Sequence, residues 1–184
     1  GEENPKAKLP PVLKLKKYLF IAQKYAYMIQ SETGSTIGRC ERRNISQFVT
    51  GADQYFRYLF FNDLNQVVAI IESHTTKAFK EPDASWKVYD YGQNLRGEIK
   101  YIVESDSWQI IGPMGEKIAG RDPGDSKTPY QAARRFTVLA ADDPEKVLFK
   151  IERKGGFKLE IIDEETDPHL AWAFVIGIHR KYFV

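Results

Sequence analysis

A stretch near the C-terminus is apolar around its whole circumference, and it limits the folds open to this chain most strongly. It runs from Leu170 to Ile178, inside a segment typical of one helix over 167–182. Asp167 fits the N-cap and Pro168 the first helical position. A helix without a polar face is buried or in a membrane. Because its apolar part is only about 13 Å long, against a bilayer core of about 30 Å, we expect it to be buried in protein.

Most of the remaining chain consists of one repeated unit. An aromatic-rich stretch of alternating pattern is followed by a turn rich in Gly, Asn, Asp or Pro and then by a second apolar stretch. The alternation predicts half-buried strands, and the turn residues predict hairpins. One further strand at each end, over 18–22 and 157–162, brings the expected total to about twelve. The five units begin near Tyr27, Tyr58, Trp86, Trp108 and Phe136.

Twelve strands and one wholly apolar helix fit together by size. Strands about 4.8 Å apart and tilted by about 40° close into a barrel roughly 24 Å across. Inward side chains leave a channel about 10 Å wide, close to the diameter of a helix, and interiors do not tolerate an empty channel of that size. The sequence therefore predicts a mainly β fold, an antiparallel closed barrel of about twelve strands around a buried C-terminal helix. The core residues expected on this helix are Leu170, Trp172, Phe174, Val175 and Ile178.

Length and composition fit one such domain. The chain has 184 residues, 42% hydrophobic and 28% charged, which is a globular balance. We divide it into a basic, Pro-containing tail over 1–17 and a single domain over 18–184. A net charge of +2 is small for a general nucleic-acid binder, and the single cysteine, Cys40, excludes a disulfide framework. No run is long enough to span a membrane and no secretory signal is recognised, so we expect a cytoplasmic protein that associates at most with a membrane surface.

The hairpins and the terminal helix resemble the tubby C-terminal-like superfamily, which includes tubby domains, LURP-one-related proteins and phospholipid scramblases. Residues 86–92, WKVYDYG, resemble the LURP-one repeat, and Phe157–Val184 resembles the last strand and helix of a scramblase. The resemblance covers about 18–184 and implies a twelve-stranded barrel around a central helix. It also implies membrane-associated, non-enzymatic work, because tubby domains bind phosphoinositide headgroups and scramblases handle lipids. The chain lacks the scramblase cysteine cluster, and its helix ends on basic residues, which weighs against scrambling.

Basic residues near the first strands are candidates for binding anionic headgroups. If these strands lie side by side, the residues form one patch, and each contributes about 1 kcal/mol near an anionic surface. The same charges also fit a role as solubilising residues and as lysines that protect an edge strand. The candidates are Lys14, Lys16, Lys17, Lys24, Arg39, Arg42 and Arg43.

An acidic run precedes the helix, at the place where the resemblance to scramblases implies a calcium segment. Its carboxylates supply the oxygen ligands that calcium prefers, although their spacing is not that of an EF-hand. The alternative is a solvated turn whose charges complement the helix N-terminus. The candidate metal ligands are Asp163, Glu164, Glu165 and Asp167. At the other end of the helix, His179 fits as a cation that complements the helix dipole.

Three functions stay open at this point. The first is a non-catalytic barrel that binds phosphoinositide or other anionic phospholipid at a membrane surface, as a tether or regulator. The second is a protein-interaction or stress-response module of the LURP-one-related type, without a lipid ligand. The third is a barrel that binds a small molecule inside, which the helix disfavours because it fills the lumen. No hydrolase, zinc-protease or dinucleotide-binding motif occurs, so the sequence predicts no catalysis, no cofactor other than calcium and no nucleic-acid partner.

Overall fold

The computed structural model describes residues 16–24, 26–44, 53–76, 84–125 and 134–183. Twelve strands and one helix lie within these ranges. In chain order they are β1 (Lys17–Ala22), β2 (Ala26–Ser31), β3 (Thr36–Asn44), β4 (Asp53–Asn62), β5 (Val67–Thr76), β6 (Ala84–Asp90), β7 (Leu95–Ile102), β8 (Ser107–Ile111), β9 (Lys117–Arg121), β10 (Arg135–Ala140), β11 (Val147–Arg153), β12 (Phe157–Ile161) and α2 (Pro168–Tyr182). The barrel therefore begins at Lys17, one residue inside the segment expected to be tail.

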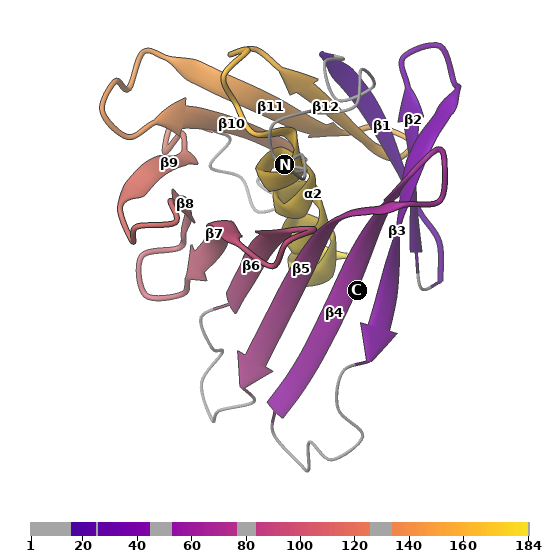
Figure 1. The fold of residues 1–184 in the computed structure, drawn as a ribbon. Coiled ribbons are helices and arrows are strands. Elements are labelled where there is room, and N and C mark those ends of the chain that lie inside the picture. Colours follow the sequence, from indigo (N-terminus) through magenta and orange to yellow (C-terminus); the bar gives the residue numbers. More distant parts are fainter. Residues whose placement is uncertain (1–15, 25, 45–52, 77–83, 126–133, 184) are drawn as a thin grey trace, which may run out of the picture.

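The strands form one closed antiparallel barrel around the helix (Figure 1). Each strand pairs with the next along the chain, and β1 pairs with β12, with Lys17 opposite Glu160 and Phe20 opposite Phe157. This closure leaves no unpaired edge among the described strands, which removes the usual site of edge-to-edge aggregation. The predicted fold, a mainly β twelve-stranded barrel with a C-terminal helix at its centre, is confirmed.

The five repeated units of the sequence share one backbone detail. In the hairpins that begin with β2, β4, β6, β8 and β10, the register shifts by one residue beside the turn, and the extra residue lies on the strand after the turn, as in a β-bulge. Four of these turns place one residue in the left-handed region, which suits Gly and, among other residues, Asn. These residues are Gly34, Asn65, Gln93 and Gly115, with φ values of 90°, 63°, 62° and 87°. The repeat therefore encodes a strand, a tight turn and a bulge in the strand that follows.

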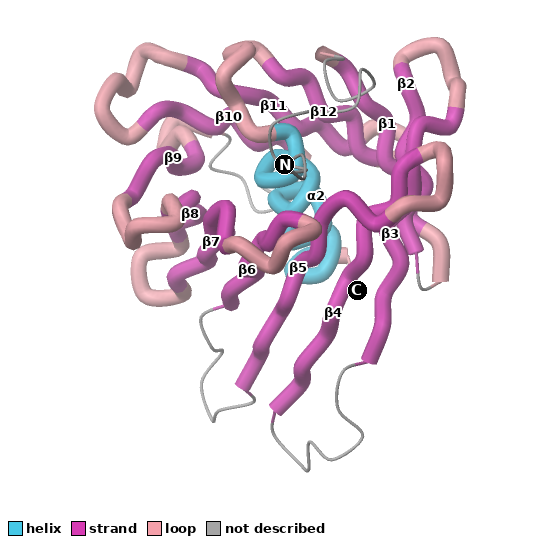
Figure 2. Tube along the Cα trace, viewed as in Figure 1, coloured by secondary structure: helices cyan, strands magenta, loops and turns pink. Residues whose placement is uncertain are grey.

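The helix α2 is buried on all sides along most of its length. Its residues from Pro168 to Ile178 are all buried, and Asp167 caps its first turn by accepting a hydrogen bond from the His169 backbone N–H. The five expected core residues, Leu170, Trp172, Phe174, Val175 and Ile178, are at most 5% exposed. Figure 2 shows the helix enclosed by the ring of strands. None of the helices in the described ranges combines the length and the hydropathy that crossing a membrane requires.

Aromatic side chains of the helix contact opposite walls of the barrel. The Trp172 ring packs edge-on against Tyr18 and Phe20 of β1 and against Phe60 of β4, with centroid distances of 5.3–5.9 Å. The Phe174 ring faces the other wall. It packs against Trp108 of β8, Phe136 of β10 and Phe149 of β11. The helix thus joins strands that are far apart around the barrel.

Gly177 lies in the middle of α2, where glycine costs about 1 kcal/mol relative to alanine. Its place is explained by two tryptophans. The rings of Trp86 and Trp108 are stacked 5.7 Å apart, and a Cβ atom at Gly177 would lie 3.3 Å from each of them. A residue without a side chain therefore lets both rings approach the helix backbone.

Trp172→Ala tests whether the helix supports the barrel. The substitution removes a large side chain that is 2% exposed and leaves a cavity, so we expect the free energy of unfolding to fall by about 3–5 kcal/mol. Met114→Ala is the matched control, because Met114 is 89% exposed and its loss should change stability by about 0.5 kcal/mol or less. Urea unfolding of both variants measures the difference. Equal midpoints for the two variants would contradict the buried helix.

His169 predicts a pH-dependent stability. It is 2% exposed, and neither ring nitrogen has a hydrogen-bond partner among the described residues. Burial lowers the pKa of His169 to about 4 from 6.5. The unfolded chain therefore binds a proton between pH 6.5 and 4 that the folded chain does not bind, and stability falls as the pH drops through this window.

His169→Phe removes the titratable imidazole and keeps an aromatic ring at the position that stacks on Phe60. We expect the loss of stability between pH 7.5 and pH 5 to be about 2 kcal/mol smaller in the variant than in the parent. Urea unfolding at the two pH values measures each loss, and the comparison between chains cancels the carboxylates that both share. An identical loss in the two chains would show that His169 titrates normally in the folded protein.

Candidate functional site

The barrel has two ends, which we name after the helix that they enclose. The N-terminal mouth surrounds Asp167, where α2 begins, and the C-terminal mouth surrounds Arg180 in its last turn. The long strands β3, β4 and β5 extend past the helix on the side of the C-terminal mouth (Figure 1). The sequence-predicted basic residues are divided between these two ends and the outer wall.

Two of these basic residues lie at the N-terminal mouth, and each is near a carboxylate. The Lys17 ammonium is 3.5 Å from the carboxylate of Glu32, and that of Lys16 is 3.9 Å from Glu164. Both lysines are exposed, so such pairs contribute little to stability. Lys14 lies outside the described residues.

Two further basic residues lie on the outer face of β3 and share one acidic neighbour. Arg39 Nε donates to one carboxylate oxygen of Glu41 at 2.7 Å, and Arg43 donates to the other at 2.8 Å. Arg39 also covers the ring of Phe61, with its guanidinium carbon 4.1 Å from the ring centroid. One negative charge thus offsets part of the positive charge of this pair.

The remaining two, Lys24 and Arg42, meet at the C-terminal mouth. They line a pocket of about 100 Å³ together with Arg180 of the helix. Arg42 follows Cys40 by two residues and lies directly opposite Tyr58 of β4, so it continues the inner face of β3 beyond the core. The residues that line the pocket are Gln23, Lys24, Ala26, Tyr27, Arg42, Tyr58, His179 and Arg180. None of these is acidic.

One aromatic ring lies beneath two of these cations. The guanidinium carbons of Arg42 and Arg180 lie 4.9 Å and 5.3 Å from the centroid of Phe56 in β4. A cation over the face of an aromatic ring is attracted by its quadrupole, by about 0.5–1 kcal/mol at an exposed site. The shared ring therefore attracts both guanidinium groups.

The His179 imidazole is neutral at pH 7, so the expectation that it is a helix-end cation was wrong. Burial and the neighbouring charges of Arg180 and Arg153 lower the pKa of His179 to about 4. Its Nδ1 atom lies 2.6 Å from the hydroxyl oxygen of Tyr27 in β2. This hydrogen bond fixes one wall of the pocket.

Tyr58 is a buried residue of the pocket lining. It is 2% exposed, yet its hydroxyl has no hydrogen-bond partner among the described residues. Burial raises the pKa of Tyr58, while Arg180 and Arg42 act in the opposite direction, so the group is a neutral phenol that can donate. A buried polar group without a partner is costly, and this one lies next to two guanidinium groups in a pocket.

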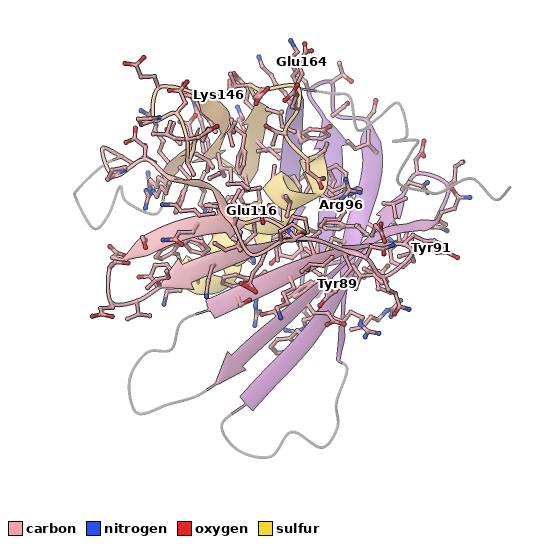
Figure 3. All side chains as sticks on the ribbon, turned by 60° about the vertical axis from the view of Figure 1, so that its left-hand side comes forward. Tyr89, Tyr91, Arg96, Glu116, Lys146 and Glu164 are labelled. Atoms are coloured by element: carbon pink, nitrogen blue, oxygen red, sulfur yellow. The ribbon has the colours of Figure 1, made fainter. Side chains whose placement is uncertain are left out.

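The acidic run before the helix is mostly engaged with basic residues. Arg96 of β7 donates to Asp167 at 2.6 Å, and the Lys146 ammonium lies 3.3 Å from Asp163. Figure 3 shows Arg96 beside the helix, with Lys146 and Glu164 towards the outer rim. Among the residues that the structure describes, no group of three or more His, Cys, Asp or Glu could hold a metal ion. Calcium binding by Asp163, Glu164, Glu165 and Asp167 stays a prediction.

Sequence reasoning identified Lys24 and Arg42 but missed the other members of this pocket. Arg180 was assigned only to the end of the helix, and Tyr58 only to a strand. A signal was present in the alternation of β3, where the inner face changes from Cys40 to Arg42. What the sequence does not show is that the last turn of α2 arrives beside that arginine.

The comparisons with known proteins bear on the fold. No protein-family model matches the chain, and no curated protein matches it. Among solved structures, the Arabidopsis thaliana protein AT5G01750 is similar, with a TM-score of 0.58 over 91% of this chain and 93% of that chain. The two sequences are 11% identical. At this identity the likeness shows a shared fold alone.

Proposed function

We propose that this chain is a non-catalytic module of the tubby C-terminal-like superfamily, of the LURP-one-related or scramblase-like type, that binds anionic phospholipid headgroups at a membrane surface. The observation that carries the proposal is the convergence of Lys24, Arg42 and Arg180 on one pocket at the C-terminal mouth. In this proposal the C-terminal mouth faces the membrane.

The charge around this mouth supports the proposed orientation. Arg153 lies over the ring of Phe183, with its guanidinium carbon 3.7 Å from the ring centroid, and the Lys181 ammonium lies 4.5 Å from the centroid of Tyr101. These two add to the three cations of the pocket. Basic residues near an anionic leaflet contribute about 1 kcal/mol each, and salt weakens the attraction. In this proposal the five cations at this end of the barrel attract the anionic surface.

Lys24→Glu tests the proposal, with Lys16→Glu as its matched control. Both lysines are exposed, but they lie at opposite mouths. Cosedimentation of the full chain with phosphatidylcholine vesicles that contain a phosphoinositide or phosphatidylserine measures binding. We expect salt-sensitive binding of the parent, about tenfold weaker binding of Lys24→Glu, and nearly parental binding of Lys16→Glu.

Two results would count against the proposal. Equal losses in the two variants would place the membrane contact elsewhere on the molecule. Failure of the parent to bind any anionic vesicle would remove the lipid function and favour the protein-interaction module.

A further inference from the structure

We propose that the pocket at the C-terminal mouth is a specific site for a terminal phosphate monoester, held by the guanidinium groups of Arg42 and Arg180 and by a hydrogen bond from the Tyr58 hydroxyl. The ligand chemistry is a dianionic phosphate on a single ester link, whether it belongs to a lipid headgroup or to a free phosphorylated molecule. For the lipid source, this inference rests on the proposed function and names the headgroup that it selects.

The first argument is the unused donor. Tyr58 is almost fully buried and lines the pocket, and its hydroxyl has no hydrogen-bond partner among the described residues. Most buried polar groups in proteins are paired, and an exception calls for an explanation. A phosphate oxygen in the pocket would accept from this hydroxyl and remove the cost of leaving it unpaired.

The second argument is the arrangement of charge. Arg42 comes from the strand β3 and Arg180 from the helix α2, and both lie over Phe56. Guanidinium groups present several N–H donors in a plane and recognise phosphate oxygens in pairs. Two such groups from different elements, with Lys24 at the rim, match a group with two negative charges better than a singly charged one.

The third argument is size. The pocket is small, with a volume of about 100 Å³. We infer that it admits one tetrahedral group with a single ester link more readily than a group with substituents on two sides. The pocket should therefore distinguish a monoester, as in phosphatidic acid, from a diester, as in phosphatidylglycerol.

The C-terminal end of α2 repels a phosphate less strongly than a helix end without nearby cations would. The last turn of α2 carries partial negative charge, but Arg180 lies there, and His179 is held by its contact with the Tyr27 hydroxyl. Three cations, Lys24, Arg42 and Arg180, line the pocket beside this partial charge.

Tyr58→Phe is the decisive variant, because it removes only the hydroxyl oxygen and keeps the ring. In the free protein that oxygen has no described partner, so we expect the variant to melt at or slightly above the parental temperature. We expect it to bind inorganic phosphate at least about tenfold more weakly, since a hydrogen bond to a charged group is lost. Isothermal titration with phosphate at constant ionic strength measures the affinity.

Two further variants control this result. Tyr101→Phe makes the same chemical change at the same mouth but outside the pocket, where the hydroxyl donates to Asp106, and it should leave phosphate affinity unchanged. Arg42→Gln should weaken phosphate binding, as Tyr58→Phe does. If Arg42→Gln fails to fold, the comparison of Tyr58→Phe with Tyr101→Phe still decides the question.

Vesicles distinguish the source of the phosphate. Stronger binding of the parent to phosphatidic acid than to phosphatidylglycerol at equal surface charge, lost in Tyr58→Phe, supports a lipid monoester. Phosphate binding that depends on Tyr58, without any binding to vesicles, supports the pocket with a free ligand and overturns the proposed function. Equal binding to the two lipids, unaffected by Tyr58→Phe, overturns the pocket and leaves the proposed function standing. No binding of phosphate or vesicles by the parent overturns both.

Discussion

Burial of the wholly apolar helix α2 is the constraint on which the rest of the structure depends. A helix without a polar face has to be surrounded by apolar side chains, and a twelve-stranded barrel has a channel that has to be filled. Each element therefore supplies what the other lacks. The rings of Trp172 and Phe174 contact opposite walls of the barrel. The helix therefore positions strands that do not pair with one another.

The candidate site is a consequence of how this core ends. Along β3 and β4 the inner face continues past the apolar core, so Arg42 and Tyr58 point the same way as Cys40 and Phe60 but lie at the mouth. The helix ends at the same level and adds Arg180. Arg42 is half-buried at this level, whereas Tyr58 is still buried. The pocket is thus built from two strands, the helix end and the turn that carries Lys24.

Prediction from sequence succeeded for the fold and only in part for the site. The twelve strands, their hairpin connections and the N-cap at Asp167 follow from local patterns, and all are present. The basic residues were treated as one patch because they are near in sequence and lie on adjoining strands. Strand direction separates Lys17, which begins β1, from Lys24, which follows the end of β1. Alternation separates Arg43 from Arg42, because the two lie on opposite faces of β3. His179 was misjudged for a related reason, because burial and two arginines suppress its charge.

The sequence by itself determined the local structure and the need for enclosure. Alternating aromatic residues, turn residues that tolerate a left-handed backbone, and a helix with no polar face leave few architectures other than a filled barrel. Only the tertiary structure decided which charges stand together, because Tyr58, Arg42 and Arg180 are brought into one pocket by closure of the barrel around the helix. Short-range patterns report on backbone conformation and burial, whereas a pocket between a strand and a distant helix depends on packing across the whole barrel.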